Sequence, residues 1–150
     1  CRAGLDLPVI RGLAEKCGRD GIDEAAQWAT WGGHTDVLDV LASEFGARIG
    51  VGCLSCALHD AAEWGHDAMI DHLVEEYGMD PNGDALHRAA IHGRVRTVKH
   101  LVEKYNVDIH KRDAFLFGDG ETALDMAESH RRTACADCLR ALLSTRPPPS

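Results

Sequence analysis

Two Cys-x-x-Cys pairs are the residues of this 150-residue chain whose types and spacing are best suited to chemistry. They are Cys53/Cys56 and Cys135/Cys138, and His59 follows Cys56 by three residues. Thiolates and an imidazole at such spacing can bind zinc, and a dithiol can also cycle through a disulfide. The two pairs are far apart in the sequence, so only the fold could bring them to one metal ion.

Nine histidines offer acid–base chemistry, but no pattern around them supports catalysis. The sequence has no Ser-His-Asp order, no phosphate-binding glycine loop and no His-Glu-x-x-His helix. We therefore expect a protein that is not an enzyme and that needs no cofactor.

The charge of the chain is unevenly distributed. Its net charge is -8, with fourteen acidic residues and one basic residue between Asp20 and Asp84, and seven basic and two acidic residues between Arg88 and Arg112. The acidic half should repel nucleic acid, and no apolar run is long enough for membrane insertion. Six cysteines make no disulfide framework in a chain of this length, which favours a reducing intracellular compartment.

The elements that must position these residues repeat along the chain. Similar segments occupy residues 10–18, 38–46, 70–78 and 98–106, at offsets of 28, 32 and 28 residues. Their apolar residues recur at i, i+3 and i+4, which predicts one buried face of a helix. Each segment ends on Gly18, Gly46, Gly78 or Asn106, where a left-handed residue would close the helix.

A second repeated segment precedes three of these helices and recurs once more near the end. It occupies residues 24–34, 56–66, 84–94 and 122–130, is rich in alanine, and carries a glycine near its end in the first three copies. Small alanines allow close helix packing, and the glycine permits a sharp reversal into the next helix. Such helical pairs stack into an array rather than closing one core.

Together these segments resemble the ankyrin repeat, whose Thr-Pro-Leu-His-x-Ala-Ala-x-x-Gly-His pattern is followed by an apolar helix ending in Gly-x-Asp. The resemblance implies an all-α ankyrin-repeat solenoid of stacked helix-turn-helix pairs with short or irregular hairpin loops. It implies a domain over residues 1–145, followed by a Pro-rich tail at 146–150. We divide that domain into a half-repeat at 7–20 and repeats at about 24–48, 56–80, 84–108 and 122–143.

The copies depart from the family pattern at the helix starts and in the loops. No copy has the proline, and the capping position holds Asp84 in one copy and Thr122 in another. Both residue types can cap a helix. The turn at 80–84 is shorter than a full hairpin, whereas the loop at 106–120 is several residues too long. The start at Cys1 and the Pro-rich end favour a piece of a larger protein.

The resemblance implies a binding face, because ankyrin repeats contact partners through positions of the first helix that line a concave groove. All three tryptophans of the chain fall on this stripe. We expect the partner-binding residues to be Trp28, Trp31, Asp60, Glu63, Trp64, Arg88, Ile91 and His92. The other reading is that the Trp rings pack on adjacent helices and shield alanine ridges.

Aromatic faces beside the carboxylates of Asp60 and Glu63, with Asp23 and Glu24 at the edge, favour a basic and partly apolar protein or peptide. The predicted function is thus a non-catalytic protein–protein interaction module that holds a partner segment in its concave groove. A narrower reading, also suggested by the resemblance, is a cation or methyl-lysine reader with a Trp cage.

The long loop offers a different function. Phe115, Leu116 and Phe117 lie at its predicted tip, so the chain could be a structural subunit of a larger complex docked through residues 114–118. The loop could equally fold back over the shortened neighbouring repeat. The repeat register argues against metal, because it places Cys135 and Cys138 at core positions two repeats away from Cys53 and Cys56.

Overall fold

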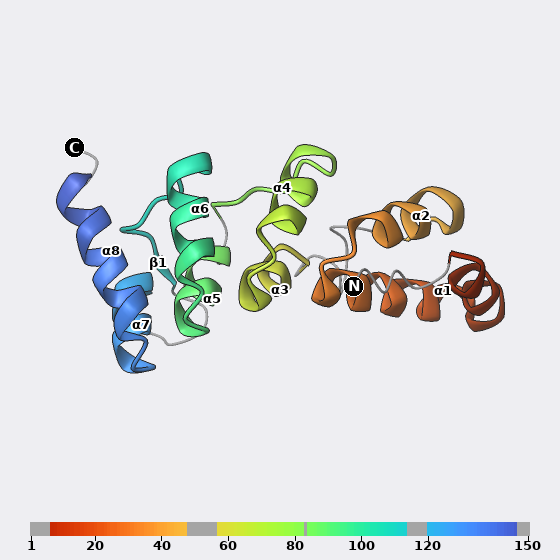
Figure 1. Cartoon of the computed structure of the whole chain (residues 1–150), viewed down its shortest axis with the longest axis horizontal. Helices are drawn as coiled ribbons and strands as arrows, with labels where there is room; N and C mark the ends of the chain where they lie inside the picture. Colours follow the sequence, from red (N-terminus) through yellow and green to blue (C-terminus); the bar gives the residue numbers. More distant parts are fainter. Residues whose placement is uncertain (1–6, 48–56, 83, 114–119, 147–150) are drawn as a thin grey trace. The chain divides into compact units, whose positions relative to one another are not determined.

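The computed structural model describes residues 7–47, 57–82, 84–113 and 120–146, and in these ranges the chain is mostly helical (Figure 1). The helices are α1 (Leu7–Gly32), α2 (Thr35–Phe45), α3 (Ala57–Trp64), α4 (Asp67–Glu75), α5 (Ala85–Ile91), α6 (Val95–Tyr105), α7 (Ala123–Ser129) and α8 (Thr133–Thr145). Two strands, β1 (Arg112–Asp113) and β2 (Glu121–Thr122), separate α6 from α7.

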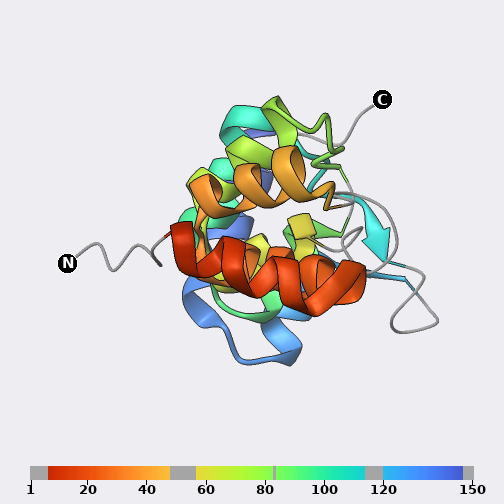
Figure 2. The same cartoon turned by 90° about the vertical axis from the view of Figure 1, so that its right-hand side faces the viewer.

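The chain divides into two compact units. The first comprises Cys1–Ala61 and Ala68–Met79, and the second comprises Ala62–Asp67 and Asp80–Ser150. In the first unit α1 packs along α2, as the red and orange helices of Figure 2 show. In the second unit α5 packs on α6 and α7, and α8 packs on the same two helices.

The second helix of each pair ends with a recurring closure. After α2, α4 and α6, a backbone N–H donates to the carbonyl six residues earlier: Ala47 to Leu41 at 3.0 Å, Met79 to Leu73 at 3.2 Å and Val107 to Leu101 at 3.4 Å. The residue before each donor has positive φ, as predicted for Gly46, Gly78 and Asn106. This is the Schellman arrangement, which satisfies carbonyls that the helix leaves unpaired.

Gly18 does not end a helix in this way, so that prediction is wrong. Its φ of 67° and ψ of -169° lie outside the left-handed helical region, and the chain returns to helix at once. The helix expected at 7–20 and the first helix of the next repeat therefore form one element, α1, with a kink at Gly18. Glycine is favoured at this position, because the same backbone conformation would be strained for any residue with a Cβ.

The first helices pack through small side chains, as the alanine pattern predicts. Ala61, Ala89 and Ala127 are fully buried. After α1, α5 and α7 the chain reverses through a backbone hydrogen bond to the carbonyl five residues earlier: His34 to Ala29, Arg94 to Ala89 and Arg132 to Ala127, at 2.7–2.8 Å.

Two arginines tie consecutive pairs of the second unit together. The Arg94 Nε–H donates to the Glu63 carbonyl at 2.8 Å, and the Arg132 Nε–H donates to the Ile91 carbonyl at 2.9 Å. Each arginine stem lies over the glycine of the preceding turn, where an added Cβ at Gly65 or Gly93 would stand 3.1 Å from the arginine Cδ. Glycine is thus favoured there, because it adopts positive φ without strain and because an added Cβ would press on the arginine stem.

The two predicted helix caps have different outcomes. Thr122 caps α7: its hydroxyl accepts from the Asp125 N–H, and the Asp125 carboxylate accepts from the Thr122 N–H at 2.9 Å. The Asp125 carboxylate also accepts from the Thr122 hydroxyl at 2.7 Å, and the two hydrogen bonds that it accepts, first that of the backbone N–H and then that of the hydroxyl, lower the pKa of Asp125. The prediction for Asp84 is wrong, since its side chain makes no cap hydrogen bond and its backbone is not extended. Its carboxylate lies 3.9 Å from the Lys111 ammonium instead.

The long loop contains a feature that an all-α prediction omits. Arg112 pairs with Thr122 and Asp113 with Glu121 as a short antiparallel ladder, β1–β2. His87 is buried, and its Nε2 lies 3.0 Å from the carbonyl of Lys111 just before β1, which gives this histidine a structural role. Phe115, Leu116 and Phe117 lie outside the described residues.

Candidate partner-binding surfaces

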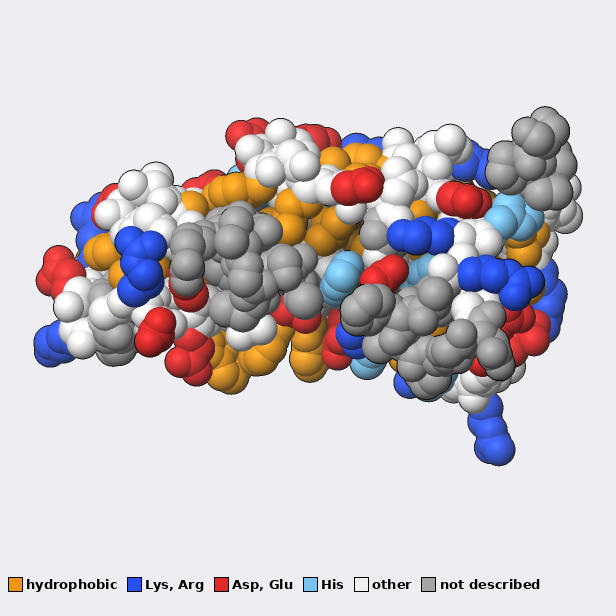
Figure 3. Space-filling model, turned by 180° about the vertical axis from the view of Figure 1, so that it is seen from behind, with side chains coloured by type: hydrophobic (Ala, Val, Ile, Leu, Met, Phe, Trp, Pro, Cys, Tyr) orange, Lys and Arg blue, Asp and Glu red, His pale blue; other side chains and the backbone are white. Residues whose placement is uncertain are grey.

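Trp28 and Trp31 form an aromatic pair at the end of α1, in the first unit. Their ring centroids lie 4.9 Å apart and their planes meet at 74°, an edge-to-face contact between residues three positions apart on one helix. Trp28 is 61% exposed and Trp31 is half-buried. Hydrophobic side chains, drawn in orange, are visible on the face of the molecule shown in Figure 3.

The same face of α1 carries carboxylates. Successive residues of a helix are about 100° apart, so five residues of α1 fall within one arc of about 100° around the helix axis. They are Asp20, Glu24, Gln27, Trp28 and Trp31. Both acidic residues are exposed. Ala26 and Ala29 are buried on the opposite side of the helix. We refer to these five residues as the α1 face.

One acidic residue expected at this edge lies elsewhere. Asp23 is 6% exposed, because its position on α1 turns it toward the buried side. Asp20, which was not among the predicted residues, takes its place on the surface. The signal was available in the spacing, since Asp20 and Glu24 precede Trp28 by two helical turns and one.

Glu63, Arg88 and His92 come together in the second unit. The Glu63 carboxylate lies 3.8 Å from an Arg88 guanidinium nitrogen and 3.5 Å from the His92 Nε2. The Glu63 and Arg88 side chains are about one-third exposed, so their ion pair is worth only about 0.5 kcal/mol. The Glu63 charge is nevertheless partly balanced within the chain, which leaves less of it for a cationic partner.

The remaining residues of the predicted stripe are placed less uniformly. Trp64, at the end of α3, is 51% exposed. Asp60 and Ile91 are half-buried, and Ile91 contributes its carbonyl to the Arg132 contact described above. Within the described part of the chain, the buried Asp60 Oδ2 has no hydrogen-bond partner.

The cysteines visible in the structure are structural in character. Cys135 is fully buried in α8 and Cys138 is half-buried, both as free thiols. Burial raises the pKa of both thiols, which disfavours the reactive thiolate. Cys53 and Cys56 lie outside the described residues. In the ranges that are described, no group of three or more His, Cys, Asp or Glu could hold a metal ion.

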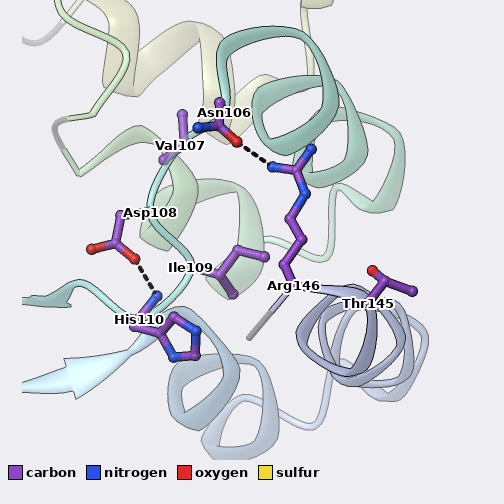
Figure 4. A pocket seen from close by; sticks show the side chains of 7 residues that line it. All are labelled: Asn106, Val107, Asp108, Ile109, His110, Thr145 and Arg146. Carbon is purple, nitrogen blue, oxygen red and sulfur yellow. Dashed lines mark hydrogen bonds between the residues drawn. The ribbon is translucent and has the colours of Figure 1, made fainter. Parts of the chain in front are cut away.

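An open cavity of about 730 Å³ lies in the second unit between the loop after α6 and the end of α8 (Figure 4). Residues 106–110, Thr145 and Arg146 line it. The Arg146 guanidinium donates to the Val102 carbonyl at 3.0 Å and to the Asn106 Oδ1 at 2.6 Å. A cation at the carboxyl end of α6 stabilises its last carbonyls, so these contacts give Arg146 a structural role.

Comparison with known families gives the same answer as the helix pairs. The family model for ankyrin repeats (three copies) matches residues 26–113 and 58–147. The chain belongs to the ankyrin-repeat family. Among curated proteins, none matches it.

Membership of this family fixes the broad class of the protein. The fold is an all-α helical repeat, and ankyrin repeats are generally non-catalytic modules for protein–protein interaction. Within the described ranges, none of the helices has the length and apolarity needed to cross a membrane.

Proposed function

We propose that this protein binds a partner protein through side chains presented by the first helices of its repeats. Trp28 and Trp31 are the anchors in the first unit. Trp64 is the anchor in the second unit. The other predicted residues there are Glu63, Arg88, Ile91 and His92. Apolar rings beside side chains of both charges suit recognition of a protein surface or segment.

The observation that supports this proposal most strongly is the exposure of two tryptophans. Trp28 and Trp64 have 61% and 51% of their surface accessible. Covering the exposed part of one such ring is worth about 3 kcal/mol at 25 cal/mol per Å². Tryptophan is also the residue type most enriched among the side chains that dominate binding energy at protein interfaces.

The alternative reading, in which the Trp rings shield alanine ridges, fits these two residues poorly. A tryptophan ring that covered a neighbouring helix would bury most of its own surface. Leu38 and Leu41 of α2 show such burial, since both are fully buried. Trp31 comes closer to that role, because it is half-buried and supports the Trp28 ring edge to face.

The test compares what the wild type captures from a cell extract with what Trp28→Ala and Trp64→Ala capture. Val9→Ala is the matched control, because Val9 is 52% exposed on α1 but lies outside the stripe. Circular dichroism first establishes that all variants are folded. We expect a partner that the wild type and Val9→Ala retain and that at least one Trp variant loses. Partners retained equally by all four proteins would refute the proposed anchors.

A further inference from the structure

We propose that the α1 face binds a segment with basic side chains, one cation lying on the Trp28 ring and the carboxylates of Glu24 and Asp20 balancing the charge. This rests on the proposed function and names the partner class for one of its two surfaces. All residues of the proposed site belong to the first unit.

The Trp28 ring is both pre-organised and exposed for contact with a cation. Trp31 holds it edge to face, which limits the rotamers available to the free protein and lowers the entropy lost on binding. A ring that is 61% exposed leaves aromatic surface open to an incoming group. Tryptophan is the best aromatic partner for an ammonium or guanidinium ion.

Charge then selects a cation over a neutral apolar group. The first unit contains twelve acidic and five basic residues, a net charge of -7, whereas the second has a net charge of -1. No basic residue occurs between Asp20 and the end of α2. Arg19 is the nearest, and it lies about 100° around the helix from Asp20, away from the tryptophans.

The carboxylates of the α1 face differ from Glu63 in the second unit. Among the residues that the structure describes, no ion pair is formed by Asp20 or Glu24, whereas Glu63 lies near both Arg88 and His92. Potential of one sign, unbalanced and beside an apolar anchor, attracts a partner of the opposite sign and steers its approach.

The spacing along α1 also constrains the partner. Glu24 and Trp28 are one turn apart, about 6 Å along the axis at 1.5 Å per residue, and Asp20 lies another 6 Å beyond. Side chains at alternate positions of an extended segment are about 6.6 Å apart on one side. Basic residues at every second position of an extended segment would therefore match the face.

The experiment measures fluorescence anisotropy of a labelled nonapeptide of alternating arginine and serine, titrated with the full chain. Citrulline in place of arginine gives a neutral peptide of the same shape. The variants are Trp28→Ala and the double variant Asp20→Asn/Glu24→Gln. The double variant Glu15→Gln/Glu76→Gln is the matched control, because it removes the same charge from exposed positions of the first unit outside the α1 face.

We expect Trp28→Ala and Asp20→Asn/Glu24→Gln each to weaken binding of the arginine peptide at least tenfold. The control should change it less than threefold, and the citrulline peptide should not bind. Equal weakening by both double variants would mean that net charge alone attracts the peptide, which overturns the proposal. So would citrulline binding as tight as arginine. If the extract partner is lost from Trp28→Ala but kept by Asp20→Asn/Glu24→Gln, the proposed function stands and the cationic assignment fails.

Discussion

Gly93 illustrates how a single residue carries a constraint from the next repeat. Its φ is +71°, and the Arg132 stem lies directly over it. Gly33 and Gly65 occupy the corresponding turns with positive φ, whereas the last turn has Arg131 at φ 56°. At Arg131 the left-handed conformation is accepted by a residue with a Cβ, at a cost of about 1 kcal/mol.

Gly93→Ala should destabilise the second unit by about 1–2 kcal/mol, because a Cβ is strained at this φ and would approach the Arg132 Cδ to 3.1 Å. Gly12→Ala is the contrasting change. Gly12 lies inside α1 with nothing within 4 Å of an added Cβ, so helix propensity should stabilise the protein by up to about 1 kcal/mol.

Urea unfolding followed by circular dichroism measures both changes. Opposite signs for the two glycines are the expected result. A Gly93→Ala protein as stable as the wild type would show that the turn relaxes without cost and that the arginine contact does not depend on glycine.

At the scale of elements, α2 and α4 of the first unit are joined by one carboxylate. Asp39 accepts a hydrogen bond from the Tyr77 hydroxyl at 2.9 Å and lies 2.7 Å from the His72 Nε2. The His72 and Tyr77 rings meet edge to face at 5.7 Å. Three residues from two consecutive helical pairs therefore stabilise the packing of these helices.

This cluster should make the stability of the first unit depend on pH in the alkaline range. Burial, and then the hydrogen bond and charge of Asp39, raise the pKa of Tyr77 well above its ordinary value near 10. The unfolded chain loses this proton near pH 10 while the folded chain keeps it. The contribution is thus fully present below about pH 10 and is lost as the pH rises further.

Tyr77→Phe should therefore unfold with a smaller loss of stability between pH 9 and pH 11 than the wild type. The free energy of urea unfolding at several pH values measures this difference. Parallel pH profiles for the two proteins would mean that the folded state does not hold the phenol proton, and the assigned role of Asp39 would be wrong.

At the scale of the whole molecule, a repeat protein distributes its stability locally. α8 packs on α6 and α7, and each pair is stabilised mainly by its neighbours. Leu139 is fully buried in α8, and Leu41 is fully buried in α2 of the other unit. Losing either side chain removes core contacts without affecting any charge.

Leu139→Ala should cost about 3 kcal/mol and should raise amide hydrogen exchange most in α7 and α8, leaving α1 and α2 nearly unchanged. Leu41→Ala should give the opposite pattern. Hydrogen exchange measured by mass spectrometry resolves the two patterns. A uniform rise across the chain in both variants would indicate one cooperative molecule instead.

Local chemistry explains which features were predictable. The left-handed closures at Gly46 and Asn106 and the cap at Thr122 depend on residues within one turn, so their sequence signals are complete. Gly18 carries the same signal but forms a kink, because the residues after it continue into helix. Asp84 has the right chemistry for a cap, yet it lies near Lys111, 27 positions later in the sequence.

The sequence by itself determined the family, the helical pairs and the alanine ridges, because these follow from residue spacing within segments of about thirty residues. Only the tertiary structure decided which charged side chains have partners within the chain. Glu63 lies near Arg88 and His92, Asp39 contacts Tyr77, and Arg146 caps α6. These contacts join residues about 25 to 45 positions apart, and they depend on how one helical pair stacks on the next, which no local pattern specifies.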